Sequence, residues 1–252
     1  RIYEEMNYRH WNDWVMDYPH PYLAKVVDGK VSNEGVKDIL EGEPYECPMR
    51  PFGGTEAFAW TPDGKQIVYS CRKETGTGYA FSTRASLYLY SVSDGTTVDL
   101  HPGDHGYDTN PAFSPDGKYL AFQSMARNGY ESDKNRLMII DMATREMRDL
   151  TASYDNNCDG FVWNADSRNL TFTGASYGTS KIFSVNVDEA KVAQVSADVQ
   201  ADYGSVTLAG NQIIATRHSM ASPDEIFALN EAGEATQLSF ENKAMLDQIE
   251  MG

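Results

Sequence analysis

The sequence predicts an all-β fold built of β-propeller blades, and the first observation behind this is an internal repeat. AFAWTPDGKQIVYS (57–70) returns as PAFSPDGKYLAFQS (111–124), and weaker copies follow at 160–174 and 204–217. A second hairpin follows each copy. Its closing apolar residue recurs every 43 to 50 residues, at Leu100, Leu150, Val195 and Leu238. Four short strands per repeat at this spacing are typical of propeller blades.

The turns and strands of the repeats are the second and third observations. In the Thr-Pro-Asp-Gly turn at 61–64 and the Ser-Pro-Asp-Gly turn at 114–117, proline presets φ and glycine accepts a positive φ, as a tight hairpin requires. Asp94-Gly95 does the same in an outer hairpin. Segments 87–90 and 137–140 are apolar on both faces, which suits sheets covered front and back. Helical periodicity is confined to the first dozen residues and 242–249.

We therefore expect residues 1–252 to form a partial propeller of about four to five four-stranded blades with WD40-like, SPDGK-type repeats. The expected blades are 1–50 (partial), 51–101, 107–151, 157–196 and 202–240, with an exit segment at 241–252. The hairpin-like sequence at 21–40 indicates the partial first blade. An incomplete ring would leave two blade faces exposed, so it predicts aggregation or pairing with another chain, including a homo-oligomer.

Composition narrows the function classes. With 41% hydrophobic and 12% aromatic residues, the chain is too apolar for disorder. The net charge of −16 repels phosphate backbones, so we expect no nucleic-acid partner. No apolar run approaches the length of a membrane span. The cysteines Cys47, Cys71 and Cys158 are widely spaced and show no CxxC motif, which predicts small buried thiols.

Gly174-Ala-Ser-Tyr-Gly178 matches the Gly-x-Ser-x-Gly nucleophile elbow of α/β-hydrolases. That elbow needs a helix directly after the serine, whose N-terminus helps to stabilise an oxyanion. Here a β-branched, strand-like segment follows Ser176, and the repeat places this serine between an inner strand and an outer strand. An order Ser176, Asp202, His218 can be drawn, but nothing in the sequence fixes its geometry. We interpret Ser176 as a loop serine and expect no catalytic residue in the chain.

Two polar clusters could suggest a metal site. His101 and His105 lie near Asp104 and Asp108, but their mixed spacing fits no strong metal template. The cluster at 155–159, with Asp155, Asn156, Asn157 and Asp159, lacks the spacing and closing glutamate of an EF-hand. We interpret both as polar blade connections and expect neither a metal nor a cofactor.

The repeats also resemble the propeller domain of the prolyl oligopeptidase family of serine peptidases, especially bacterial dipeptidyl-peptidase-like members. The resemblance rests on an ordered set of segments that covers most of the chain: YRHWNDW (8–14), PFGGTEAFAWTPDGK (51–65), residues 110–151 and SMASPDEIFALN (219–230). Family members carry a C-terminal α/β-hydrolase domain with the catalytic Ser, Asp and His. The resemblance thus implies a propeller that gates and recognises peptide substrates for a hydrolase domain beyond these residues. It also implies an exported, periplasmic setting.

Strand alternation indicates which blade face meets the hydrolase domain. The Pro-Asp-Gly turns lie on one face, and the entries to the inner strands and the connections between strands two and three lie on the other. The residues expected on this second face are Glu56, Asp108, Asn110, Asp159, Asp202 and the loop residues Arg127, Tyr130, Glu131 and Asp133. In the family, propeller carboxylates hold the amino terminus of the substrate.

Within that face, the resemblance suggests Glu131 for a substrate amine, Arg127 for a carbonyl or carboxylate and Tyr130 for packing. The alternative is that Arg127, Glu131 and Asp133 form ordinary loop ion pairs. The helical Glu-Glu pair of the family is not visible in this sequence, so the resemblance alone does not assign the amine ligands.

Two rival functions remain open from the sequence. One is a non-enzymatic propeller that binds protein partners, similar to the periplasmic Tol-system protein, which shares SPDGK-type repeats. The other makes Ser176 the nucleophile of a self-contained hydrolase. Whether a hydrolase domain follows Gly252 in the gene would separate these readings from the peptidase propeller.

Overall fold

The computed structural model describes residues 2, 8–10, 12–50 and 53–249 of the chain. Strands are the main regular structure of these residues, which confirms the all-β prediction. The helices among them are short: the 3-10 turn η1 (Thr55–Ala57), α1 (Gly76–Phe81) and α2 (Lys243–Leu246). None of these helices is long and apolar enough to cross a membrane.

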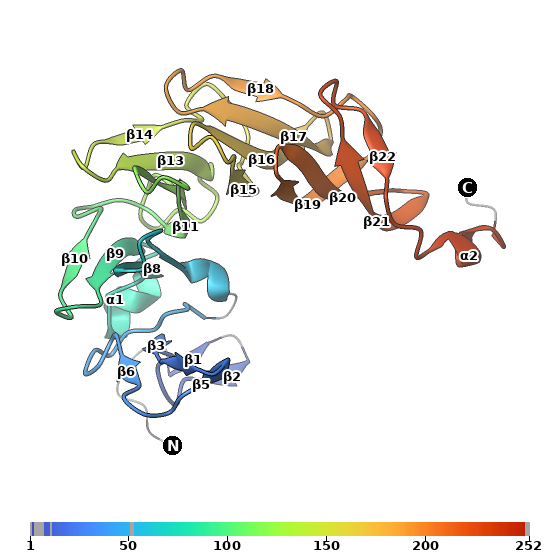
Figure 1. Cartoon of the computed structure of the whole chain (residues 1–252). Helices are drawn as coiled ribbons and strands as arrows, with labels where there is room; N and C mark the ends of the chain where they lie inside the picture. The colour runs from blue at the N-terminus through green and yellow to red at the C-terminus, as the bar shows by residue number, and fades with distance from the viewer. Residues whose placement is uncertain (1, 3–7, 11, 51–52, 250–252) are drawn as a thin grey trace. The chain divides into compact units, whose positions relative to one another are not determined.

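Four antiparallel four-stranded sheets, each with its strands in chain order, make up most of the described chain (Figure 1). The first two sheets contain β7 (Phe58–Trp60), β8 (Gln66–Cys71), β9 (Ser86–Ser91) and β10 (Thr97–Asp99), then β11 (Asp108–Phe113), β12 (Tyr119–Ser124), β13 (Arg136–Asp141) and β14 (Met147–Asp149). The next two contain β15 (Gly160–Trp163), β16 (Asn169–Ser176), β17 (Thr179–Asn186) and β18 (Val192–Gln194), then β19 (Asp202–Ala209), β20 (Gln212–Ser219), β21 (Ser222–Leu229) and β22 (Ala235–Gln237).

Short two-stranded ladders precede these sheets. They are β1 (Arg9–His10) with β2 (Asp13–Trp14), β3 (Tyr22–Leu23) with β6 (Lys37–Asp38), and β4 (Val26–Val27) with β5 (Lys30–Val31). The hairpin expected at 21–40 is therefore present, with its tip at the positive-φ pair Asp28-Gly29. The first dozen residues, for which the sequence suggests a helix, contain strand β1 in their described part.

The Ser-Pro-Asp-Gly turn between β11 and β12 shows why this motif recurs. The Ser114 hydroxyl donates to the Asp116 carboxylate at 2.6 Å and accepts from the backbone N–H of Tyr119 at 3.0 Å. Gly117 has a φ of 72°, which a side chain would strain. Thr61 repeats the same contacts in the hairpin between β7 and β8. These side-chain bonds close the hairpin and set the strand register.

The chain divides into two compact units. The first unit contains residues 1–113, 120–133 and 142–145, and the second contains 114–119, 134–141 and 146–252. In the first, Tyr69 and Tyr88 stack at 5.5 Å within a core that includes Leu40. In the second, the fully buried Phe172 stacks on Phe183 at 5.5 Å. The first core includes β9, where the segment 87–90 is buried on both faces as the sequence predicts. In β16 the buried apolar residues Leu170 and Phe172 alternate with buried threonines.

The three cysteines are fully buried free thiols, which confirms the prediction from their spacing. Burial raises the pKa of both Cys47 and Cys158 to about 12. The pKa of Cys71 is also raised, first by burial and then by the neighbouring Cys47. Because the thiolate is the reactive form, these side chains pack as small apolar groups and do not act as nucleophiles.

We expect Ellman's reagent to find no reactive thiol in the native protein at pH 8, because burial blocks access and suppresses ionisation. All three thiols should react once urea unfolds the chain. Rapid reaction of a thiol under native conditions would contradict the burial described above.

We also expect Phe172→Ala to lower the free energy of unfolding by about 3–5 kcal/mol, because it removes a fully buried ring and leaves a cavity. Urea denaturation followed by tryptophan fluorescence measures the loss. Phe81→Ala is the matched control, since Phe81 is 80% exposed, and its effect should stay within about 0.5 kcal/mol. Equal effects of the two substitutions would contradict the packing of the second unit.

Candidate functional site

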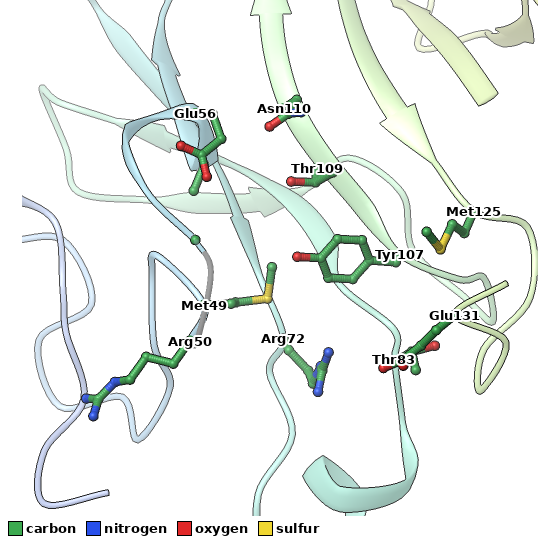
Figure 2. Close-up of a pocket in the computed structure, with 12 residues that line it drawn as sticks. Met49, Arg50, Glu56, Arg72, Thr83, Tyr107, Thr109, Asn110, Met125 and Glu131 are labelled. Atoms are coloured by element: carbon green, nitrogen blue, oxygen red, sulfur yellow. The ribbon is translucent and has the colours of Figure 1, made fainter. Parts of the chain in front are cut away.

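The first unit contains a cavity of about 510 Å³, which we name the inner-strand pocket (Figure 2). Several separate chain segments supply its walls, from the segment before η1 to the connection after β12. The lining residues are Met49, Arg50, Gly53, Glu56, Ala57, Arg72, Thr83, Tyr107, Thr109, Asn110, Met125 and Glu131. The volume lies in the lower part of the range of small-ligand pockets, about 300–1,000 Å³.

The pocket collects residues that the sequence places on one blade face. Glu56 precedes β7, Asn110 lies near the start of β11, and Glu131 belongs to the connection between β12 and β13. All three line the cavity. Asn110 has a φ of 52° at a β-bulge between Thr109 and Ala112. Such a bulge re-aims side chains, so the adjacent residues Thr109 and Asn110 can both face the cavity.

Arg72 is the cation of the pocket. It follows β8, and its guanidinium lies over the Tyr79 ring, 4.8 Å from the centroid. Its Nη1 donates to the Tyr79 carbonyl at 3.5 Å, the outer limit of a hydrogen bond, and its buried Nε has no partner among the described residues. Since a buried unpaired guanidinium N–H is costly, Arg72 is suited to receive an acceptor from a ligand.

Arg50 is engaged elsewhere. Its Nη2 donates to Asp17 at 3.0 Å, and its Nε lies 3.3 Å from the Glu46 carboxylate. In Figure 2 its guanidinium points away from Arg72. The charged groups available to a ligand in the cavity are therefore the Arg72 guanidinium and the carboxylates of Glu56 and Glu131.

Tyr107 presents a hydroxyl to the same space. Burial raises the pKa of Tyr107, while the positive charge of Arg72 acts in the opposite direction. The charges of Glu56 and Glu131 also raise it, which places both carboxylates within electrostatic reach of this hydroxyl. Tyr107 therefore remains a neutral hydrogen-bond donor at physiological pH.

The carboxylates differ in how they are held. Glu56 Oε1 accepts from the backbone N–H of Gly54 at 2.7 Å, which orients it at the entry to β7. Glu131 makes no hydrogen bond or ion pair with the described residues, although it lines the cavity. A carboxylate free of partners can accept a cationic ligand without first losing a bond to the protein.

The other loop residues suggested by the sequence have structural contacts. Arg127 pairs with Asp133 through its backbone N–H at 2.9 Å and through its guanidinium, which also lies 4.0 Å from the centre of the Tyr130 ring. None of these three side chains lines the cavity described above. Arg127 and Asp133 thus form the ordinary loop ion pair that the alternative describes. Glu131 lies on the same loop and lines the pocket.

Asp108 lies apart from the pocket. Its side chain is fully buried, and its Oδ2 lies 2.6 Å from His101 Nδ1. His105 also approaches it, so that the two imidazoles and this carboxylate place possible metal-ligating atoms within 4.8 Å of one another. The imidazole rings are stacked, however, with centroids 3.9 Å apart and planes within 6°. An ion cannot lie in both ring planes at once, as imidazole ligation requires, so this arrangement does not fit a metal site.

Asp159 and Asp202 belong to the second unit. Asp159 lines a separate cavity of about 440 Å³, and burial raises its pKa. Asp202 accepts from the Ser180 backbone N–H at 2.7 Å and lies 3.9 Å from His218 Nε2. His218 in turn contacts Asp224 at 3.1 Å, so its nearest acidic partner is not Asp202.

Ser176 is the last residue of β16 and pairs with Thr179, the first residue of β17. Between them, Tyr177 and Gly178 have φ values of 47° and 80°, as in a two-residue hairpin turn. Strand β17 begins at Thr179, so the serine is followed directly by a strand and not by a helix. The interpretation of Ser176 as a connection between two strands is confirmed, and the hydrolase elbow is absent at this position.

Ser176→Ala should leave fluorophosphonate labelling of the full-length protein unchanged, because a hairpin serine has neither a general base nor an oxyanion site. Gel fluorescence of the labelled variant and the wild type measures this. A loss of labelling on substitution would contradict the hairpin assignment.

Comparison with known proteins agrees with this architecture. A family model described as the TolB β-propeller domain (PD40) matches residues 82–244. Dipeptidyl-peptidase 5 of Porphyromonas gingivalis is 39% identical over 250 residues, which cover 99% of this chain and 36% of that protein. The chain thus spans about a third of the length of this relative.

Solved structures share the fold at low sequence identity. Acylaminoacyl peptidase of Pyrococcus horikoshii matches with a TM-score of 0.60 at 18% identity, over 77% of this chain and 28% of that one. TolB of Acinetobacter baumannii matches with a TM-score of 0.52 at 20% identity, over 82% and 46%. The predicted propeller fold and the predicted resemblance to prolyl oligopeptidase-type peptidases are confirmed. The chain belongs to the TolB β-propeller domain family.

Proposed function

We propose that this chain is the propeller portion of a dipeptidyl-peptidase-like serine peptidase, and that its inner-strand pocket receives the amino-terminal end of a peptide substrate. One observation carries the proposal: a guanidinium with an unpaired N–H and two carboxylates line one cavity. The similarity to dipeptidyl-peptidase 5 along almost the whole chain supports it. The catalytic Ser, Asp and His would belong to an α/β-hydrolase domain of the same parent protein.

A peptide amino terminus carries a positive charge that must be paired when it leaves water. Glu131 is the first candidate for this contact because it has no partner among the described residues. Glu56, oriented by the Gly54 backbone N–H, can supply a second carboxylate. Charge-assisted hydrogen bonds of this kind are about twice as strong as neutral ones.

Arg72 then suits the carbonyl oxygen of the first or second residue of the substrate. Its unpaired Nε–H and its weakly held Nη1–H are donors, and a carbonyl oxygen accepts without adding a charge. Tyr107 can donate a further hydrogen bond, because burial keeps its hydroxyl protonated. Together these groups would bind a charged amine and the peptide carbonyl that follows it. Every free peptide amino terminus has these two groups.

A propeller that only binds protein partners, as in the Tol system, is the weaker proposal. The likeness to TolB is 20% in sequence and shows the fold alone, whereas the dipeptidyl-peptidase relative is 39% identical. The resemblance to bacterial dipeptidyl peptidases supports a further proposal, that the protein is exported to the periplasm. Osmotic-shock fractionation of the native bacterium would test this location.

We expect Glu131→Gln in the full-length enzyme to lower kcat/KM for dipeptide substrates with a free amino terminus by about tenfold to a hundredfold, because it removes the charge that pairs with the amine. Glu56→Gln and Arg72→Met should each lower it by about tenfold. N-acetylated substrates should not distinguish Glu131→Gln from the wild type.

Glu231→Gln is the matched control, since Glu231 is an exposed carboxylate on the β21–β22 hairpin and its loss should leave kcat/KM unchanged. If Glu131→Gln also left kcat/KM for free-amine substrates unchanged, the proposed amine site would be rejected.

A further inference from the structure

A histidine–aspartate cluster, in which His105 and Asp108 are buried and His101 is half-buried, lies in the first unit where the chain enters β11. We name it the His–Asp cluster; it comprises His101, His105 and Asp108. The Asp108 side chain is fully buried, with His101 Nδ1 at 2.6 Å and His105 Nδ1 at 3.6 Å from its Oδ2. The two imidazole rings stack face to face, 3.9 Å apart. No role for this cluster follows from the pocket chemistry described above.

The cluster is joined to the pocket through the backbone. Asp108 is the first residue of β11, and its neighbours Tyr107, Thr109 and Asn110 all line the inner-strand pocket. Its backbone N–H donates to the Ala85 carbonyl at 3.0 Å, and its carbonyl accepts from Ser70. Because neighbouring side chains of a strand alternate, the buried Asp108 side chain anchors the segment from behind while Tyr107 and Thr109 face the cavity.

Two buried polar atoms of the cluster, His105 Nδ1 and Asp108 Oδ1, have no hydrogen-bond partner among the described residues. Two further charged groups act on His105: Asp99, which favours its protonation, and Arg84, which opposes it. Ser86 connects this side of the cluster, since its hydroxyl donates to Asp99 at 2.5 Å and lies 3.4 Å from His105 Nε2. One buried carboxylate therefore faces two stacked imidazole rings.

We propose that Asp108 and His105 are positioning residues for the inner-strand pocket. With at most one positive charge on the imidazole pair, Asp108 holds the start of β11 so that Tyr107, Thr109 and Asn110 line the cavity. A second positive charge on the stacked rings repels the first at short range and has no second buried carboxylate in the cluster to pair with. The strain is relieved when the connection 101–110 opens, which withdraws the pocket wall.

The direction of the pH dependence follows from burial. Desolvation lowers the pKa of His105, and the charges of His101 and Arg84 act in the same direction, against Asp108 and Asp99. An imidazole whose pKa is lower in the folded state stabilises the fold above its ordinary pKa, near 6.5, and loses that contribution as the pH falls through the folded value. Acid, and not alkali, should therefore open the segment.

The link to substrate rests on the proposed function of the pocket, but opening of the segment can be measured without substrate. Hydrogen–deuterium exchange of the full-length protein, read on peptides covering 103–113 and corrected for intrinsic exchange rates, reports it at pH 7.5 and 5.5. We expect the protection of these amides to fall by about threefold or more at pH 5.5. In His105→Gln, which cannot take the second proton, protection should be the same at both pH values.

His218→Gln is the matched control, because it removes an exposed histidine–aspartate contact in the other unit and should retain the wild-type pH dependence. If His105→Gln does not fold, NMR titration of the wild-type histidines provides the test. The proposal requires a histidine with a lowered pKa whose titration coincides with shifts of the Tyr107 and Thr109 amides. Protection of 103–113 that is independent of pH in the wild type would overturn the proposal.

Two further outcomes are informative. A change in protection on adding zinc, reversed by EDTA, would show that the cluster is a metal site and would overturn the proposal. If protection changes as expected but kcat/KM of the wild type and His105→Gln shows the same pH dependence, the pocket does not serve the substrate. In that case the proposed function fails while the opening of β11 stands.

Discussion

Sheets that are apolar on both faces must be covered on both faces, and this constraint determines the rest of the structure. The central strands β8, β12 and β16 are largely buried, so the three sheets that contain them cannot stand alone in water. In the first unit β11 packs against β7, β8 and β9, and in the second β19 packs against β15, β16 and β17. Because this packing covers the side chains of the central strands, side chains that are accessible to a ligand lie at strand entries and in the connections between strands.

The inner-strand pocket follows from that arrangement. Its charged groups come from η1, from the residue after β8 and from the connection after β12, so each is held by a different segment. Arg72 Nε has no partner in the part of the chain that the structure describes. The Arg127–Asp133 pair holds the loop of Glu131 without using the Glu131 carboxylate. The groups proposed to contact a ligand are thus ones that the contacts of the fold do not use.

Much of the fold could be predicted from the sequence because its signals are local. The Ser114 turn, the apolar strands and the strand that follows Ser176 each depend on a few adjacent residues. Strand alternation also places Glu56 and Glu131 on one face, and both line the inner-strand pocket, while their role in binding substrate stays a prediction. Arg72 was missed, because a single arginine after an apolar strand is an ordinary loop residue until tertiary packing shows what surrounds it.

The surroundings of Asp108 likewise could not be predicted from the sequence. Its position at a strand entry suggests a pocket residue, but its side chain is buried against the two histidines of the preceding connection, and a β-bulge follows between Thr109 and Ala112. The short helix α1 was likewise not predicted, since its sequence, GTGYAF, carries no helical periodicity. Contacts such as that of Tyr79 with Glu46 hold it in place.

A crystal structure of the full-length protein with a non-hydrolysable dipeptide analogue that has a free amino terminus tests the central claim most directly. We expect the ammonium nitrogen within about 3 Å of the Glu131 carboxylate, and the first carbonyl oxygen directed at Arg72. A bound analogue whose amine is held by other residues, with the inner-strand pocket left to solvent, would contradict it.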